Sequence, residues 1–123
     1  MAVGAVMLAV RPHGEQEALT LTTSNGVTHL RWHTGMNDAV MHSGTIVVGD
    51  DDCLYVTLSD TGESYLAAVG PDDRVARDGV THGGVLVAVG EVSTFGRVTP
   101  PGEAPAVALE RCTGATEWYG IGW

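Results

Sequence analysis

Three apolar segments follow one another in residues 45–69, TIVVGDDDCLYVTLSDTGESYLAAV. Turn-forming Gly, Asp and Ser separate these segments, and β-branched residues dominate the first of them. Segments of this length and composition are typical of β-strands. We therefore predict strands over 45–48, 53–58 and 64–69, the last two forming an antiparallel hairpin across a loop that contains Asp and Gly.

A second hairpin is predicted upstream, around the Asn-Gly pair at 25–26. Both residue types tolerate positive φ, which the tight turn of a two-residue hairpin requires. We predict its strands over 18–22 and 27–33. Alternation along the second strand places Leu30 and Trp32 on one face, and this face is expected to be the buried one.

The same signals assign most of the remaining chain. Residues 1–10 are predicted to form a buried strand, residues 36–43 a single helical turn or a loop, and residues 71–82 a polar loop. Residues 85–89 are entirely apolar, which predicts a central strand. Two more strands are predicted, over 91–98 and 116–123.

One helix is predicted near the C-terminal end of the sequence. Thr99 is placed to cap it, Glu103 lies near its N-terminal dipole, and Gly114 follows at the C-cap position. A strand is the alternative over 104–112, because residues there also alternate. The expected class is α+β and strand-rich: a mostly antiparallel sheet of about seven short strands with one short C-terminal helix, in a single globular domain over 1–123.

The charge balance limits the partners of this chain. Fifteen Asp and Glu residues oppose six basic residues, all of them Arg, and the formal net charge is −9. A field of this sign repels nucleic acid and anionic membranes and attracts basic proteins. We therefore expect a basic protein partner, and neither nucleic acid nor a membrane.

Cysteine content and the N-terminal run bear on the compartment. Cys53 and Cys112 are too few for a disulfide framework, and each lies in an apolar stretch. We predict two buried free thiols, with a disulfide between them as the alternative. The apolar run over 2–10 lacks a charged leader and is too short to span a bilayer. A cytoplasmic location is expected, and the oligomeric state is left open.

The sequence contains no catalytic or metal-binding motif of any specificity. His29 and His33 are four residues apart, but on a strand this spacing separates them by roughly 13 Å, too far for one zinc ion. Residues 50–52 are consecutive acids, whereas a calcium loop needs acids at alternate positions. We predict no catalytic residue, no metal and no cofactor. The alternative is a ligand pocket lined by His29, Arg31 and His33.

Acidic residues fall in several of the predicted turns, and aromatic residues lie on neighbouring strands. Carboxylates that steer a basic enzyme, beside aromatic anchors, are typical of tight inhibitors. Hairpin geometry is expected to gather these turns at one end of the domain. The predicted partner-binding residues are Asp50, Asp51, Asp52, Asp60, Glu63, Tyr65, Asp72, Asp73, Trp118 and Tyr119.

Three segments resemble the small immunity proteins encoded beside secreted polymorphic toxins in high-GC bacteria. These are the strand, acidic turn and strand over 45–58, the aromatic strand ending in Gly over 63–70, and the Pro/Glu start, Ala-rich helix and final strand over 101–123. The first 43 residues depart from the family, which opens with a strand and a longer helix. The resemblance implies a non-catalytic protein that blocks the active-site mouth of a toxin.

The expected function is therefore that of an acidic immunity or inhibitor protein. Two other classes fit the same residues. A phage virion protein, such as a head decoration or tail accessory protein, would pair by strand addition and form an oligomer. A small β-barrel enzyme or ligand-binding protein would instead hold a buried pocket.

Overall fold

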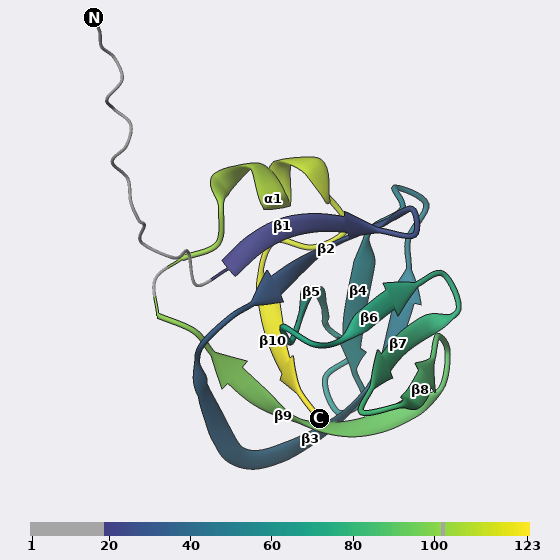
Figure 1. Cartoon of the computed structure of the whole chain (residues 1–123), viewed down its shortest axis with the longest axis vertical. Coiled ribbons are helices and arrows are strands. Elements are labelled where there is room, and N and C mark those ends of the chain that lie inside the picture. The colour runs from purple at the N-terminus through teal and green to yellow at the C-terminus, as the bar shows by residue number, and fades with distance from the viewer. Residues whose placement is uncertain (1–18, 102) are drawn as a thin grey trace, which may run out of the picture.

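The computed structural model describes residues 19–101 and 103–123, so the strand predicted over 1–10 lies outside the described residues. Within them the chain forms ten strands and one short helix (Figure 1). The elements are β1 Leu19–Ser24, β2 Val27–Trp32, β3 Met36–Val48, β4 Leu54–Leu58, β5 Ser64–Val69, β6 Arg74–Ala76, β7 Gly79–His82, β8 Val85–Ala88, β9 Val92–Thr99, α1 Ala106–Arg111 and β10 Trp118–Gly122.

Five strands close into a ring. β4 pairs with β5, β5 with β10, β10 with β9, β9 with β3, and β3 with β4. β5 divides one of its edges between two partners: residues 64–66 pair antiparallel with β4, and residues 68–69 pair parallel with β2. The β1–β2 hairpin is therefore attached to the ring through the pairing of β2 with β5.

The prediction of a strand-rich fold with one short helix is confirmed. The prediction of a mostly antiparallel sheet of about seven strands is wrong, because the larger sheet is mixed and the described strands outnumber that estimate. Both β2 and β10 run parallel to β5. Parallel neighbours are joined by long connections rather than tight turns, so no local signal marks them.

Two buried clusters of side chains lie on opposite faces of the ring wall. The inner cluster takes residues from all five ring strands, including Ile46, Val56 and Phe95. The outer cluster joins the other face of β4 and β5, for example Tyr55 and Leu66, to the β1–β2 hairpin and α1. Strands buried on both faces have apolar side chains at successive positions, as the sequence of β4 and β5 shows.

The hairpin predicted at residues 25–26 is confirmed. β1 and β2 pair antiparallel up to Ser24 and Val27, and Asn25 and Gly26 have φ of 52° and 81°. Only half of the burial prediction holds, however. Leu30 is buried in the outer cluster as expected, but Val27 on the opposite face is buried in the inner cluster, because β2 also lies between two layers.

The prediction of a helical turn or loop over 36–43 is wrong. These residues form the first part of β3, which pairs with β9 from Met36↔Thr99 to His42↔Phe95 and beyond, with a register shift between Asn37 and Met41. The strand depends on a partner far along the chain, so its own sequence carries little signal.

The segment after β5 also differs from the prediction. Residues 71–82 contain β6 and β7 instead of only a loop, and β8 is the edge of this three-stranded sheet instead of a central strand. Val85 is 65% exposed. The turn from β7 to β8 is a two-residue Gly-Gly hairpin with φ of 58° and 83°, which is a recognised hairpin signal.

The helix predicted near residue 104 exists, and the strand alternative over 104–112 is wrong. Its ends differ from the prediction: Pro105 occupies the N-cap in place of Thr99, and Cys112 occupies the C-cap in place of Gly114. No helix among the described residues has the length and apolar character needed to cross a membrane.

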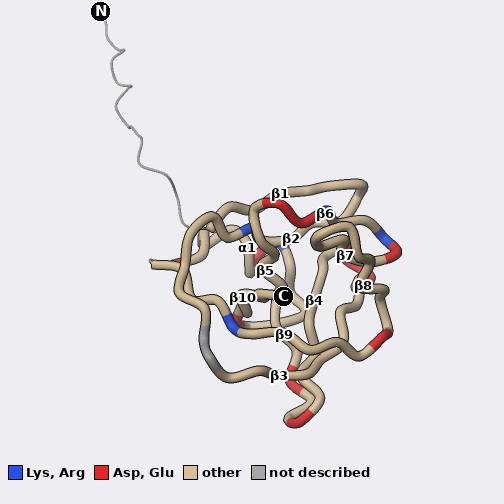
Figure 2. Tube along the Cα trace, turned by 60° about the horizontal axis from the view of Figure 1, so that its bottom comes forward, with Lys and Arg blue, Asp and Glu red and all other residues tan. Residues whose placement is uncertain are grey.

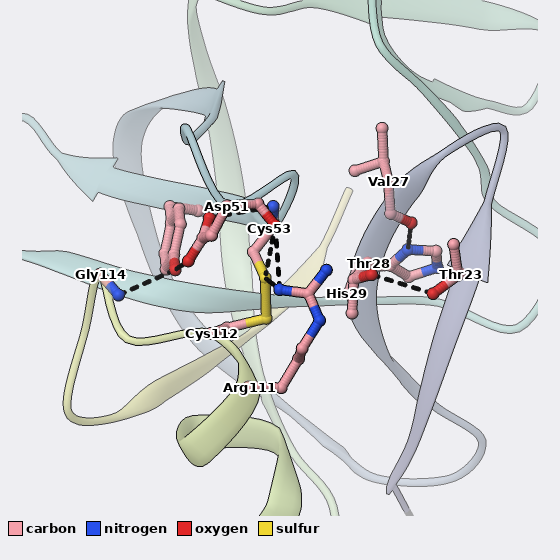
Figure 3. Close-up of a disulfide and its surroundings, with 10 residues drawn as sticks. Thr23, Val27, Thr28, His29, Asp51, Cys53, Arg111, Cys112 and Gly114 are labelled. Carbon is pink, nitrogen blue, oxygen red and sulfur yellow. Dashed lines mark hydrogen bonds between the residues drawn. A yellow bond between two sulfur atoms is a disulfide. The ribbon is translucent and has the colours of Figure 1, made fainter.

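A disulfide joins Cys53 to Cys112, so the prediction of free thiols is wrong (Figure 3). It ties the C-cap of α1 to the residue before β4, and both cysteines are fully buried. Hydrogen bonds reinforce the link. Tyr55 Oη donates to Asp51 Oδ2 at 2.6 Å and accepts from Gly114 N at 2.9 Å. We call this group, residues 51, 53, 55, 112 and 114, the helix clamp.

We predict that the variant Cys53→Ala/Cys112→Ala loses on the order of 4 kcal/mol of unfolding free energy, because the disulfide closes a loop with a sequence separation of 59. Urea unfolding of the variant, the oxidised protein and the reduced protein measures this loss. The reduced protein is expected to match the variant. Equal stability of oxidised and reduced protein would contradict the role of the clamp.

His29 is a fully buried polar side chain on β2. Its Nδ1 donates to the carbonyl of Val27 at 3.1 Å (Figure 3), and its Nε2 accepts from Arg31 at 3.3 Å. Burial disfavours the imidazolium and lowers the pKa of His29 from 6.5 to about 4. A neutral imidazole satisfies both hydrogen bonds, so the folded state needs the uncharged form.

This pKa predicts acid lability. Between pH 6.5 and about 4 the unfolded chain binds a proton at residue 29 that the folded chain does not bind. The unfolding free energy therefore decreases as the pH is lowered through this range, by up to about 3 kcal/mol. Urea unfolding across this pH range measures the slope. His29→Gln should remove that part of the slope, whereas the control His33→Gln at an exposed position should keep it. An unchanged slope in His29→Gln would refute the assignment.

Candidate functional site: an acidic groove with aromatic walls

Two adjoining hollows lie on the surface beside β5, α1 and β10. The larger has a volume of about 400 Å³ and the smaller about 260 Å³, and both are lined by Thr116 and Glu117. Because they adjoin at these two residues, we treat them as one groove. We define the acidic groove by its acidic and aromatic residues, Glu63, Tyr65, Glu103, Glu117 and Trp118.

The chain positions these residues through pairing inside the ring. Tyr65 and Trp118 belong to the parallel pair β5–β10, in which Trp118 lies opposite Leu66. The amide of Leu66 donates to the carbonyl of Glu117 at 2.9 Å, which holds the start of β10 beside Tyr65. Glu103 approaches from the segment before α1. Three remote parts of the sequence therefore meet at the groove.

The phenol of Tyr65 lies in a negative field. Its Oη donates to Glu63 Oε1 at 2.7 Å. This hydrogen bond is the main cause that raises the pKa of Tyr65 above 10, and the charges of Glu63 and Glu117 act in the same direction. The groove therefore favours positive charge and disfavours further negative charge.

One basic side chain, Arg97 of β9, also lines the larger hollow. Its guanidinium carbon lies 4.9 Å from the centroid of the Tyr119 ring, in a cation–π contact. The three carboxylates of the groove thus outnumber its one cation, and that cation rests on an aromatic face.

The predicted partner-binding residues do not gather at one end of the molecule. Figure 2 shows the acidic segments spread around the trace. Asp50, Asp60 and Asp72 are exposed at separate turns. Asp52 forms an ion pair with Arg77 at 2.6 Å. Of the predicted set, Glu63 and Tyr65 line the smaller hollow and Trp118 lines the larger one.

Three of the predicted residues are buried or hydrogen-bonded within the fold. Tyr119 is 1% exposed in the inner cluster, and Asp73 is 6% exposed, so both side chains are buried. Asp51 belongs to the helix clamp. Burial alone would raise its pKa, but hydrogen bonds from Tyr55 and the backbone outweigh this effect and lower the pKa.

Sequence reasoning missed Glu103 and Glu117 as members of the groove. Glu117 immediately precedes Trp118, and Glu63 lies two residues before Tyr65. An acid close to an aromatic residue is therefore a signal that was available. The parallel register that brings the two pairs together was not available, because it follows from tertiary pairing.

The alternative of a ligand pocket lined by His29, Arg31 and His33 finds no support in the placement of the first two side chains. His29 is buried, and Arg31 is held by the carbonyls of Gly70 and Asp73. In the part of the chain that the structure describes, no group of three or more His, Cys, Asp and Glu side chains is arranged to hold a metal ion. Comparison with protein-family models, curated proteins and solved structures found no match.

The field in the groove predicts a titration. Glu63→Gln should lower the pKa of Tyr65 toward 10, because it removes the negative charge that accepts the phenol hydrogen bond. Ultraviolet absorbance of tyrosinate measures the shift, and Tyr65→Phe identifies the transition that belongs to this residue. The control Glu91→Gln should leave the transition unchanged. A Tyr65 pKa unaffected by Glu63→Gln would show that Glu63 does not create the field.

Proposed function

We propose that the protein is a non-catalytic binding protein that takes a basic segment of a partner protein into the acidic groove, as an inhibitor or immunity protein would. The observation that carries this proposal is the composition of the groove: three carboxylates and two aromatic side chains against one arginine. Trp and Tyr are the residues most often found as anchors of protein interfaces, and Lys or Arg side chains pair with both carboxylates and aromatic faces.

The net charge of −9 supports the same proposal at longer range. A strongly negative molecule attracts a basic partner before contact and raises the rate of encounter, especially at low salt. The carboxylates of the groove then orient the partner, and Tyr65 and Trp118 supply the apolar area. The resemblance to immunity proteins agrees with this division of roles and adds a toxin as the class of partner.

The compartment in which this binding takes place is part of the proposal. A cytoplasmic location stays a prediction, and the Cys53–Cys112 disulfide argues against it, because cytosolic thiols are kept reduced. We infer that the protein acts where its disulfide persists. Its redox state in cells, trapped by thiol alkylation, tests this point.

Titration of the oxidised protein with the capped peptide Lys-Arg-Lys-Arg-Lys tests the groove. At about 10 mM ionic strength the Debye length is about 30 Å, so weak electrostatic binding is measurable. Amide chemical shifts should change first at residues 63–65 and 116–118. The variant Glu63→Lys/Glu117→Lys should bind at least about tenfold more weakly, because two attractive charges become repulsive.

The matched control is Asp78→Lys/Glu91→Lys, which changes the formal charge equally at exposed positions outside the groove. The Kd of this control variant for the peptide should lie within about twofold of the wild-type Kd at the same low salt. Equal weakening in both double variants, or shifts spread over every acidic turn, would show that charge alone attracts the peptide. That result would overturn the groove as the binding site.

A further inference from the structure

A third hollow, of about 210 Å³, shares no lining residue with the acidic groove. It lies where the end of β2, the segment after β5, β7 and the end of β10 meet. Two tryptophans, Trp32 and Trp123, contribute to its wall together with the polar side chains of Asn37, Asp72, Asp73 and His82. This combination of indole rings and planar polar groups lies outside the function proposed above.

The polar side of the hollow is built around a fixed histidine. Asp73 has a side chain 4% exposed, and its Oδ2 accepts the amide of Gly70 at 2.8 Å. Its Oδ1 lies 2.6 Å from Nδ1 of His82. A carboxylate only accepts hydrogen bonds, so Nδ1 carries the proton. Nε2 accepts a hydrogen bond when the ring is neutral and donates one when the ring is charged, so it can bond a hydroxyl group in either form. The imidazole, itself 46% exposed, lines the hollow.

The aromatic side is fixed as well. Nε1 of Trp32 donates to the carbonyl of Ile121 at 2.9 Å, which sets the orientation of that indole. The Trp123 ring lies 5.9 Å from the His82 ring and 6.4 Å from the Phe95 ring. The two indoles are therefore part of the packed structure, and a ligand meets preformed walls.

We infer that this hollow binds a single neutral pyranose ring. A pyranose has an apolar C–H face, which stacks on an indole, and a rim of hydroxyl groups. Hydroxyl groups both donate and accept, so they match the carboxylate of Asp72, Nε2 of His82 and the amide of Asn37. An organic cation would use the indoles and Asp72 but leave Nε2 and the amide without a role.

The size of the hollow supports one ring only. Pockets for drug-sized ligands span about 300–1,000 Å³, so 210 Å³ excludes an oligosaccharide or a nucleotide held entirely within it. A ligand of about twelve heavy atoms that gains about 0.3 kcal/mol of binding free energy per heavy atom binds with a Kd near 1 mM. We call this site the pyranose pocket.

Saturation-transfer NMR of the intact oxidised protein tests the assignment. The probes are the methyl α-pyranosides of glucose, galactose and mannose. At least one should receive saturation at its ring C–H protons and shift the indole signals of Trp32 or Trp123, with a Kd near 1 mM. Absence of saturation for all three at about 50 mM would overturn the proposal.

Two variants locate the binding. His82→Phe keeps an aromatic ring but removes Nε2, and Asn37→Ala removes the amide without touching the Asp73–His82 pair. Each substitution should raise the Kd of the pyranoside about tenfold or more, whereas His33→Phe, outside the pocket, should leave the Kd unchanged. The thermal unfolding midpoint checks that each variant is folded. Wild-type affinity in both pocket variants would overturn the assignment.

Two further outcomes contradict the proposal. Tighter binding of tetramethylammonium than of every pyranoside would define the hollow as a cation site. Loss of pyranoside binding in Glu63→Lys/Glu117→Lys, with retention in His82→Phe, would place the sugar in the acidic groove. Failure of the peptide titration leaves the pyranose pocket intact, because the two sites share no residue.

Discussion

The rest of the structure depends on the pairing of β5 along both of its edges. One edge is divided between β4 and β2, and the other is taken by β10 in parallel. This arrangement closes the ring and attaches the hairpin at the same place. It also buries β5 on both faces, with Ala67 in the inner cluster and Ala68 in the outer one. Because protein interiors are close-packed, the small side chains of Ala67 and Ala68 leave room for the elements that cover the two faces of β5.

The acidic groove and the pyranose pocket are consequences of this pairing. β10 starts beside Tyr65, which brings Trp118 to the groove, and it ends beside Trp32, which contributes to the pocket. The helix clamp has the complementary role of holding α1 against the outer cluster, and α1 forms part of the groove wall. Reduction of the disulfide is therefore expected to affect stability first and the groove second, while the pocket lies on other elements.

What the sequence predicted correctly is what neighbouring residues encode. Turn chemistry located the hairpin at 25–26 and the β4–β5 hairpin. It failed where a strand depends on a remote partner, as the first part of β3 does, and where an available Gly-Gly turn at 83–84 was overlooked. The candidate site followed the same rule. Charge and aromatic pattern singled out Glu63, Tyr65 and Trp118, but their assembly with Glu103 required the tertiary pairing, as did the meeting of the two cysteines.

The closed ring requires the parallel register of β10 on β5, and backbone NOEs in isotope-labelled, oxidised protein measure this register. We predict contacts from Trp118 to Leu66, from Tyr119 to Ala67 and from Gly120 to Ala68, so that residue numbers rise together along both strands. We also predict contacts from Leu30 to Ala68 on the other edge. Contacts between β5 and β10 in the opposite order, or their absence, would contradict the closed ring and both sites that it positions.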